Sequence, residues 1–191
     1  MGSCNSGGKG NGSGGLPFTK GKPIPPDVAV NNANAKRASN GRGYQENCQR
    51  CAWAFEMQRR GYDVEALPSP KDDYLCKGDN WMRIAQSKLT KDFVGASSVK
   101  TEVANITYTM QNWGEGSRGI VRMVKGGDGH AFNVEYKNGK VVAYDAQTGW
   151  KGSLTSILSG SIRNYTSLVR SDNVKFNPKE VSKYVKERGS K

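Results

Sequence analysis

The dipeptide Asn138-Gly139 constrains the fold more than any other feature of this sequence. It separates residues 130–136 from residues 141–145, and both segments are rich in the β-branched and aromatic residues that strands favour. Asn and Gly tolerate the positive φ angles that the commonest two-residue hairpin turn requires. The sequence therefore predicts an antiparallel hairpin whose loop is the dipeptide itself.

The register of this hairpin places a histidine beside a carboxylate. With a two-residue loop, one face of the hairpin carries His130, Phe132, Val134, Tyr136, Val141, Ala143, Asp145 and Gln147. Phe132 then opposes Asp145 and His130 opposes Gln147, which makes His130 and Asp145 diagonal neighbours roughly 7–8 Å apart at the backbone. A carboxylate on a mostly apolar face is costly unless it is paired. We therefore expect His130, the one histidine of the chain, to pair with Asp145 as a base with its orienting acid.

The nucleophile that such a pair needs is expected on a helix nearer the N-terminus. Asn47 is a good N-cap, Gly61 is a stop signal, and residues 48–60 between them form a helical pattern. Cys48 is then the first helical residue, where unpaired backbone amides and the helix dipole favour a thiolate. Cys51 lies one turn further along, on the side expected to face the core. The local chemistry therefore favours Cys48 as the nucleophile.

The other patterns predict an α+β domain, because helices come first and a meander of strands follows. We expect a strand over 62–67, a helix over 79–89, a helix or a strand over 103–113, a strand over 119–125 with a turn at 126–129, and a helix over 178–188.

The N-terminal segment has a different composition. Residues 1–15 are rich in Gly, Ser and Asn, and no convincing apolar face appears before residue 43. We therefore expect a flexible tail over 1–42 and one domain over 43–191. Met1–Ser6 fits the N-myristoylation pattern, with Cys4 open to palmitoylation. Chance is the better explanation in so Gly-rich a segment, and we expect no lipid anchor.

Charge and hydropathy limit the classes of function. No apolar stretch approaches the ~20 residues of a membrane-spanning helix, and no apolar h-region follows Met1, so we expect neither a transmembrane segment nor a signal peptide. The formal net charge of +12 favours anionic partners, including nucleic acid. Because the Lys and Arg residues are spread along the chain, we interpret the charge mainly as a solubility and encounter effect.

Four segments, in this order, resemble one known family: NCQRC at 47–51, RRGYDVEA at 59–66, GHAFNV at 129–134 and DAQTG at 145–149. The family is that of the papain-fold toxins, often described as glutamine deamidases. Similar domains occur at the C-termini of bacterial polymorphic toxins and in phage head-associated proteins. The resemblance covers about residues 44–150.

The resemblance implies a papain-like fold, in which a nucleophile helix packs on an antiparallel sheet, and a triad of Cys48, His130 and Asp145. It also implies attack of a thiolate on a carboxamide, an acyl-enzyme resolved by water, and no cofactor or metal. The expected partners are a protein substrate and a cognate immunity protein or virion proteins. The expected setting is delivery into a target cell or carriage in a virion.

Two positions leave alternatives open. Related enzymes use a Gln shortly before the cysteine to help form the oxyanion hole, and Gln45 lies six residues before Cys51, the papain spacing, but only three before Cys48. Cys51 therefore remains the alternative nucleophile. Where the family usually has Asp-Pro-Gln, this chain has Asp145-Ala146-Gln147, which keeps both polar groups and makes Gln147 a candidate site residue.

Other functions fit some of the same residues. Cys48 and Cys51 could form a redox CxxC pair, could join Cys76 and His130 in a Cys3His zinc site, or could be inert core residues. At the level of the whole protein, we expect a thiol amidohydrolase acting as a toxin, either a glutamine deamidase or a protease. The alternative is a virion structural or cargo protein whose basic surface contacts packaged DNA.

Overall fold

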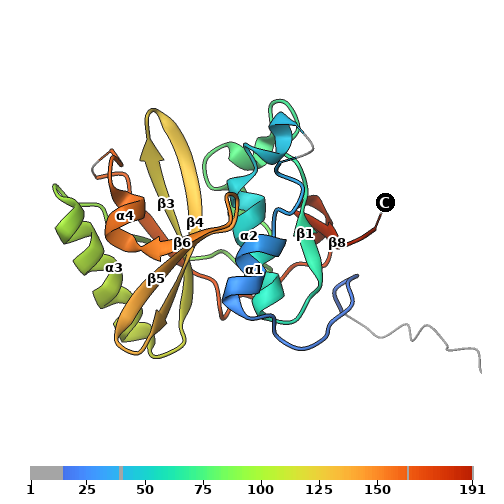
Figure 1. The fold of residues 1–191 in the computed structure, drawn as a ribbon, viewed down its shortest axis with the longest axis horizontal. Coiled ribbons are helices and arrows are strands. Elements are labelled where there is room, and N and C mark those ends of the chain that lie inside the picture. Colours follow the sequence, from blue (N-terminus) through green and yellow to red (C-terminus); the bar gives the residue numbers. More distant parts are fainter. Residues whose placement is uncertain (1–14, 39–40, 163, 191) are drawn as a thin grey trace, which may run out of the picture.

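The computed structural model describes residues 15–38, 41–162 and 164–190. It confirms the α+β class: helices lie on both faces of a six-stranded antiparallel sheet (Figure 1). The strand order is β2-β7-β3-β4-β5-β6. The strands are β2 (Lys91–Phe93), β3 (Arg118–Lys125), β4 (Asp128–Lys137), β5 (Lys140–Asp145), β6 (Trp150–Ser153) and β7 (Ser167–Arg170).

The predicted hairpin is confirmed as β4 and β5. Asn138 and Gly139 have φ angles of 52° and 73°, as the expected turn requires. Tyr136 pairs with Val141 in the predicted register, but the ladder ends at Asn133 and Tyr144. The predicted pairing of His130 with Gln147 is therefore wrong, because β5 ends at Asp145 and the chain turns there toward β6.

The strand at 119–125 is also confirmed, although its turn is shorter than expected. Gly126 and Gly127, both with positive φ, form a two-residue turn, and β4 already begins at Asp128. The predicted turn over 126–129 is thus wrong in its second half. The early start lets β4 reach past the end of β5, which places His130 near the rim of the sheet.

Each face of the sheet has its own core. On one face, Val121, Phe132 and Ala143 are buried with apolar residues of α3 (Val99–Trp113) and α4 (Leu154–Leu158). On the other face, residues such as Ile120 and Tyr144 are buried with residues of α1 (Pro26–Asn32) and α2 (Cys48–Arg59). Every residue of α2 from Gln49 to Gln58 is buried, which makes this helix the centre of its layer.

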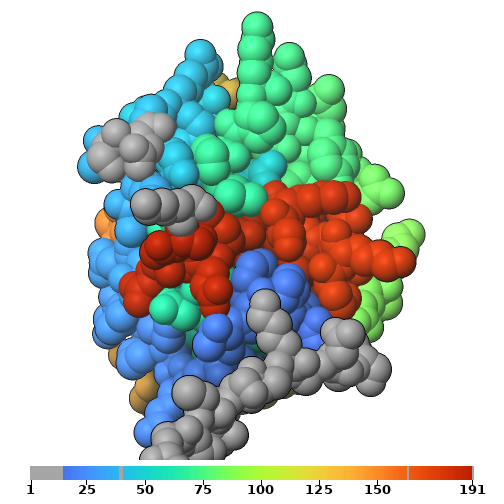
Figure 2. Space-filling view, turned by 90° about the vertical axis from the view of Figure 1, so that its right-hand side faces the viewer, coloured from blue at the N-terminus to red at the C-terminus, as the bar shows by residue number. Residues whose placement is uncertain are grey.

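A two-stranded sheet of β1 (Val64–Ala66) and β8 (Val185–Glu187) lies on the far side of α2 from the main sheet (Figure 1). Figure 2 shows the C-terminal segment beside the first described residues, and the Thr19 amide donates to Glu187 Oε1 across 3.1 Å there. The strand predicted over 62–67 is confirmed as β1, but β1 covers only Val64–Ala66.

Two predicted helices are wrong. Residues 79–89 contain only a single 3₁₀ turn at Asn80–Met82, and residues 178–188 contain a 3₁₀ turn at Val181–Lys183 followed by β8. Ala85 of the first segment bridges to Phe176, and β8 of the second segment pairs with β1, so each segment pairs with a distant part of the chain instead of forming a helix. Tertiary pairing overrides the helical spacing of their apolar residues. The ambiguous segment 103–113 is helical, within α3.

The predicted tail extends too far. Pro26 starts α1, and Ala29, Val30 and Ala33 are buried in the core beside α2. A prediction of loose structure is therefore wrong for this part of residues 1–42. Three small apolar residues made too weak a pattern to be recognised as a face. The Gly-rich start, with Cys4 and the lipidation pattern, lies outside the described residues. No described helix has the length and hydropathy needed to cross a bilayer.

Candidate active site

Cys48 lies at the start of α2, half-buried in the wall of a cavity of about 610 Å³. The cavity wall also includes Gln45, Gln49, Cys76, Trp81, His130 and Gln147. The first amides of a helix have no acceptor within the helix, so the start of α2 favours negative charge near Cys48.

Asn47 precedes Cys48 but does not cap the helix with its side chain, contrary to expectation. Its Nδ2 donates to the Leu67 carbonyl across 3.0 Å, and its Oδ1 accepts from the Cys51 thiol across 3.1 Å. The fully buried Asn47 instead ties the start of α2 to the chain that follows β1. The Asn47 side chain therefore does not cap the first amides of α2.

His130 and Asp145 are brought together as predicted. His130 Nε2 donates to Asp145 Oδ2 across 3.1 Å, from the first part of β4 to the last residue of β5. The Asp145 carboxylate is held from the other side, where its Oδ1 accepts from the Gln147 amide across 3.1 Å. The turn after β5 therefore fixes one carboxylate oxygen, and the other oxygen orients the imidazole.

Burial favours the neutral forms of His130 and Asp145, but their mutual attraction favours the charged forms more strongly. Burial lowers the pKa of His130, but hydrogen bonds to Asp145 and Cys48 outweigh it and raise the pKa from 6.5 to about 10. Burial raises the pKa of Asp145, but the hydrogen bond and charge of His130 outweigh it and hold the pKa below 3.8. The imidazole is thus a cation near neutral pH, and it lines the same cavity as Cys48.

Cys51 has a different environment. Its side chain is 0 % exposed, and it is absent from the cavity wall. Burial raises the pKa of the Cys51 thiol well above 9.0, and the nearby Cys48 and Asp145 add to the shift. A neutral thiol without access to the cavity is poorly suited to nucleophilic attack.

The two glutamines expected near the site meet at the cavity. Gln147 Nε2 donates to the Gln45 carbonyl across 2.9 Å, which links the turn after β5 to the segment before α2. Asn34, just after α1, donates to the Gln147 carbonyl across 3.0 Å. Sequence reasoning missed Asn34 because it lies in the predicted tail. It also missed Gln49, for which spacing gave no signal, and it considered Cys76 only as a zinc ligand.

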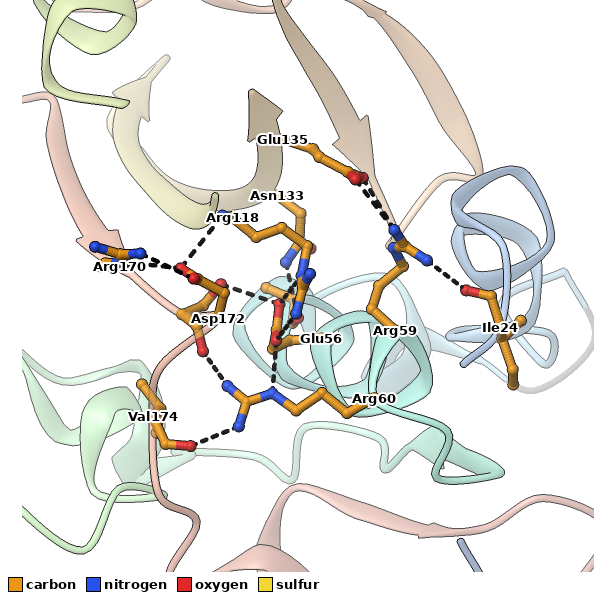
Figure 3. Close-up of polar contacts among 12 residues, drawn as sticks. Ile24, Glu56, Arg59, Arg60, Arg118, Asn133, Glu135, Arg170, Asp172 and Val174 are labelled. Atoms are coloured by element: carbon orange, nitrogen blue, oxygen red, sulfur yellow. Dashed lines mark hydrogen bonds and ion pairs between the residues drawn. The ribbon is translucent and has the colours of Figure 1, made fainter. Parts of the chain in front are cut away.

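Buried charges hold α2 in place two turns beyond Cys48 (Figure 3). The fully buried Glu56 accepts two hydrogen bonds from Arg118 of β3, both of 2.9 Å, and one from Arg60 of 2.7 Å. Ser171, after β7, donates to the same carboxylate across 3.1 Å. Next to this cluster, Arg59 pairs with Glu135 of β4 across 3.1 Å. These contacts set the position of α2 against the sheet that carries His130.

The described cysteines form no disulfide. Cys48, Cys51 and Cys76 are free thiols. Across residues 15–38, 41–162 and 164–190, no group of three or more His, Cys, Asp and Glu side chains could hold a metal ion. The zinc-site alternative therefore has no support in this part of the chain.

A family model described as "Papain fold toxin 1, glutamine deamidase" matches residues 46–150, more than half of the 191 residues. The matched range contains Cys48, His130 and Asp145. No curated protein and no solved structure gives a significant match.

Proposed function

Because the chain belongs to the family of papain-fold toxins described as glutamine deamidases and shares its papain-like fold, we propose that it is a thiol-dependent deamidase of protein glutamine side chains. The observation that carries this proposal is the convergence of three groups. Cys48 and His130 line one cavity, and His130 Nε2 donates to Asp145 Oδ2 across 3.1 Å. In this proposal Cys48 is the nucleophile, His130 the acid and base, and Asp145 the orienting carboxylate.

The first half-reaction starts from the ion pair of Cys48 thiolate and His130 imidazolium. The thiolate attacks the carboxamide carbon, and a C–S bond forms as the carbonyl π bond opens to an oxyanion. His130 gives its proton to the departing nitrogen, and the C–N bond breaks with release of ammonia. A thioester on Cys48 remains. Asp145 accepts from Nε2, which leaves Nδ1 as the nitrogen that exchanges this proton.

The second half-reaction uses the same residues in the opposite sense. The neutral imidazole of His130 takes a proton from water, and the resulting hydroxide adds to the thioester carbon. The C–S bond then breaks, which releases a glutamate side chain and regenerates the thiolate. Asp145 stabilises the imidazolium formed in this step and keeps the ring in one orientation.

The oxyanion needs donors at the start of α2. The Cys48 amide, which has no acceptor within the helix, is one such donor. The second is assigned to Gln45, which lines the cavity, with its backbone carbonyl held by Gln147. The family resemblance implies this role for a Gln before the cysteine. The variant that tests the role is Gln45→Ala.

Intact-mass spectrometry of candidate target proteins tests the reaction. Deamidation adds about 1 Da per site, because NH2 is replaced by OH in the product of the acyl-enzyme. The change should be absent with Cys48→Ala. Fragments in place of this shift would instead assign proteolysis, which shares the first half-reaction. A target pool unchanged by wild type and by Cys48→Ala alike contradicts both activities.

A virion-associated role stays a separate prediction. Its support would be DNA binding that weakens steeply with salt and survives Cys48→Ala. Capture of an immunity protein is likewise a prediction that follows from the family alone.

A further inference from the structure

The carboxamide of Gln49 joins two cysteine sulfurs at the cavity. The Cys48 thiol donates to Gln49 Oε1 across 3.3 Å, and Gln49 Nε2 donates to the Cys76 sulfur across 2.8 Å. Cys48 and Gln49 are adjacent on α2, whereas Cys76 comes from the 3₁₀ turn Tyr74–Cys76. A single amide thus connects the nucleophile helix to the opposite wall.

The surroundings of Gln49 restrict how its amide turns. Gln49 is only 6 % exposed, so few water molecules can reach its amide. Burial raises the pKa of the Cys76 thiol above 9.0, and the charge of Asp73 also contributes. Cys76 is therefore a neutral thiol near pH 7, with a sulfur lone pair that accepts from Nε2.

We propose that Gln49 is a positioning residue that stabilises the protonated form of the Cys48 sulfur relative to the thiolate, with Cys76 as its anchor. This inference rests on the proposed role of Cys48 as nucleophile. The Gln49 carbonyl oxygen accepts only from the protonated sulfur and repels a thiolate. His130 acts oppositely, because its imidazolium stabilises the thiolate. The balance between these two partners sets how much thiolate is present before substrate arrives.

Other ionisable groups surround the sulfur. The basic groups in the cavity wall besides His130 are Arg42, Arg122 and Lys125. The acidic groups and thiols around it are Glu46, Asp128, Cys76, Asp73 beside Cys76, Asp145 behind His130, and Cys51 one turn along α2. Most of these groups are common to every variant compared below, so their effects on the sulfur cancel in the comparison.

Alkylation of Cys48 by iodoacetamide across pH tests the proposal. Trypsin cuts after Arg42, Arg50 and Lys71, so mass spectrometry reads Cys48, Cys51 and Cys76 in separate peptides. Gln49→Met keeps the length of the side chain without its hydrogen bonds, and should speed alkylation of Cys48 about three- to tenfold at acidic pH, the value of one modest hydrogen bond. Cys76→Ala should act in the same direction, because it frees the amide to turn Nε2 toward the sulfur. Cys76→Ser keeps an acceptor and should follow wild type.

Three results would overturn the proposal. They are a wild-type pH profile in Gln49→Met or in Cys76→Ala, slower alkylation in either, or a Cys76→Ser profile that follows Cys76→Ala. Slower alkylation would mean that Gln49 donates to the thiolate. The assay needs no glutamine substrate, so its outcome is independent of the mass test for deamidation. A chain that deamidates nothing but shows these shifts would keep the inference and lose the proposed function.

Discussion

Cys48 and Cys51 are one helical turn apart, and their surroundings differ in every respect that matters for a nucleophile. Cys48 is at the end of α2, beside uncapped amides and a protonated imidazole. Cys51 is in the core, where it donates to Asn47. The spacing of Gln45 to Cys51 favours Cys51 as the nucleophile, but the burial of Cys51 argues more strongly against it.

We expect Cys48→Ala to abolish activity and Cys51→Ala to keep most of it, with some loss of stability from the buried hydrogen bond. Iodoacetamide at mildly acidic pH should label the peptide that contains Cys48, because the imidazolium supports a thiolate there. Preferential labelling of the peptide that begins at Cys51 would transfer the role to Cys51.

Asp145→Asn should fold normally and lose about 10²- to 10⁴-fold in kcat, because the amide keeps the shape without the charge that supports the imidazolium. The measurement is kcat by ammonia release, with circular dichroism as the check of folding. Thr148→Val is the matched control, since it changes a neighbour of Asp145 on the same turn. A wild-type rate in Asp145→Asn would remove Asp145 from the mechanism.

The pKa of His130 also predicts a dependence of stability on pH. Its folded value of about 10 lies above the unfolded value near 6.5, so its contribution is complete below pH 6.5 and is lost as pH rises toward 10. Urea unfolding should show wild type most favoured over His130→Gln near pH 6, with the difference shrinking by pH 10. A difference that is constant over this range would contradict the raised pKa.

At the scale of elements, the position of α2 depends on charges that are buried between it and the sheet. Glu56 lies two turns from Cys48 and accepts hydrogen bonds from Arg118 and Arg60 (Figure 3). Ser171 donates to the same carboxylate. A buried ion is costly on its own, and removing one member leaves the others uncompensated. The network therefore makes the placement of α2 sensitive to single changes far from the cavity.

Glu56→Gln should destabilise the protein by about 3–5 kcal/mol, because Arg118 and Arg60 would then face a neutral amide. The measurement is urea unfolding. Glu180→Gln is the control, since its pair with Lys183 lies at the surface and should be worth less than about 1 kcal/mol. Equal effects of the two changes would show that the Glu56 network contributes no more than a surface pair.

At the scale of the whole molecule, the domain extends beyond the range that matches the family. The match begins at residue 46, yet α1 packs its apolar residues into the core, and Asn34 holds the turn that carries Gln147. Residues 26–34 are therefore part of the folded unit and support one wall of the cavity.

Deleting residues 1–14 should leave stability and activity nearly unchanged, because their Gly-rich composition offers little apolar surface to bury. Deleting residues 1–34 should lower the melting temperature by several degrees and reduce activity, since the buried Ala29, Val30 and Ala33 are lost. Thermal unfolding of both truncations measures this. Equal melting temperatures would show that α1 adds nothing to the fold.

Local chemistry was enough to predict some parts of this protein. Asn138-Gly139 determined a turn and a register because few other residues accept positive φ at both positions. Two-residue alternation then placed His130 and Asp145 on one face, and the start of α2 marked Cys48 as different from Cys51. These features depend on residues close together in sequence, and the class of the fold followed from their order.

Only the tertiary structure decided where these pieces meet. Residues 79–89 and 178–188 have helical spacing, but each finds a partner strand or loop distant in sequence, and that pairing buries the same apolar side chains without a helix. The role of α1, the burial of Glu56 with two arginines, and the contact of Gln49 with Cys76 likewise join residues that are far apart along the chain. Sequence determines the local conformations, because backbone and turn preferences act over a few residues. Burial and charge pairing depend on which distant segments pack together, and that is settled only when the whole chain has folded.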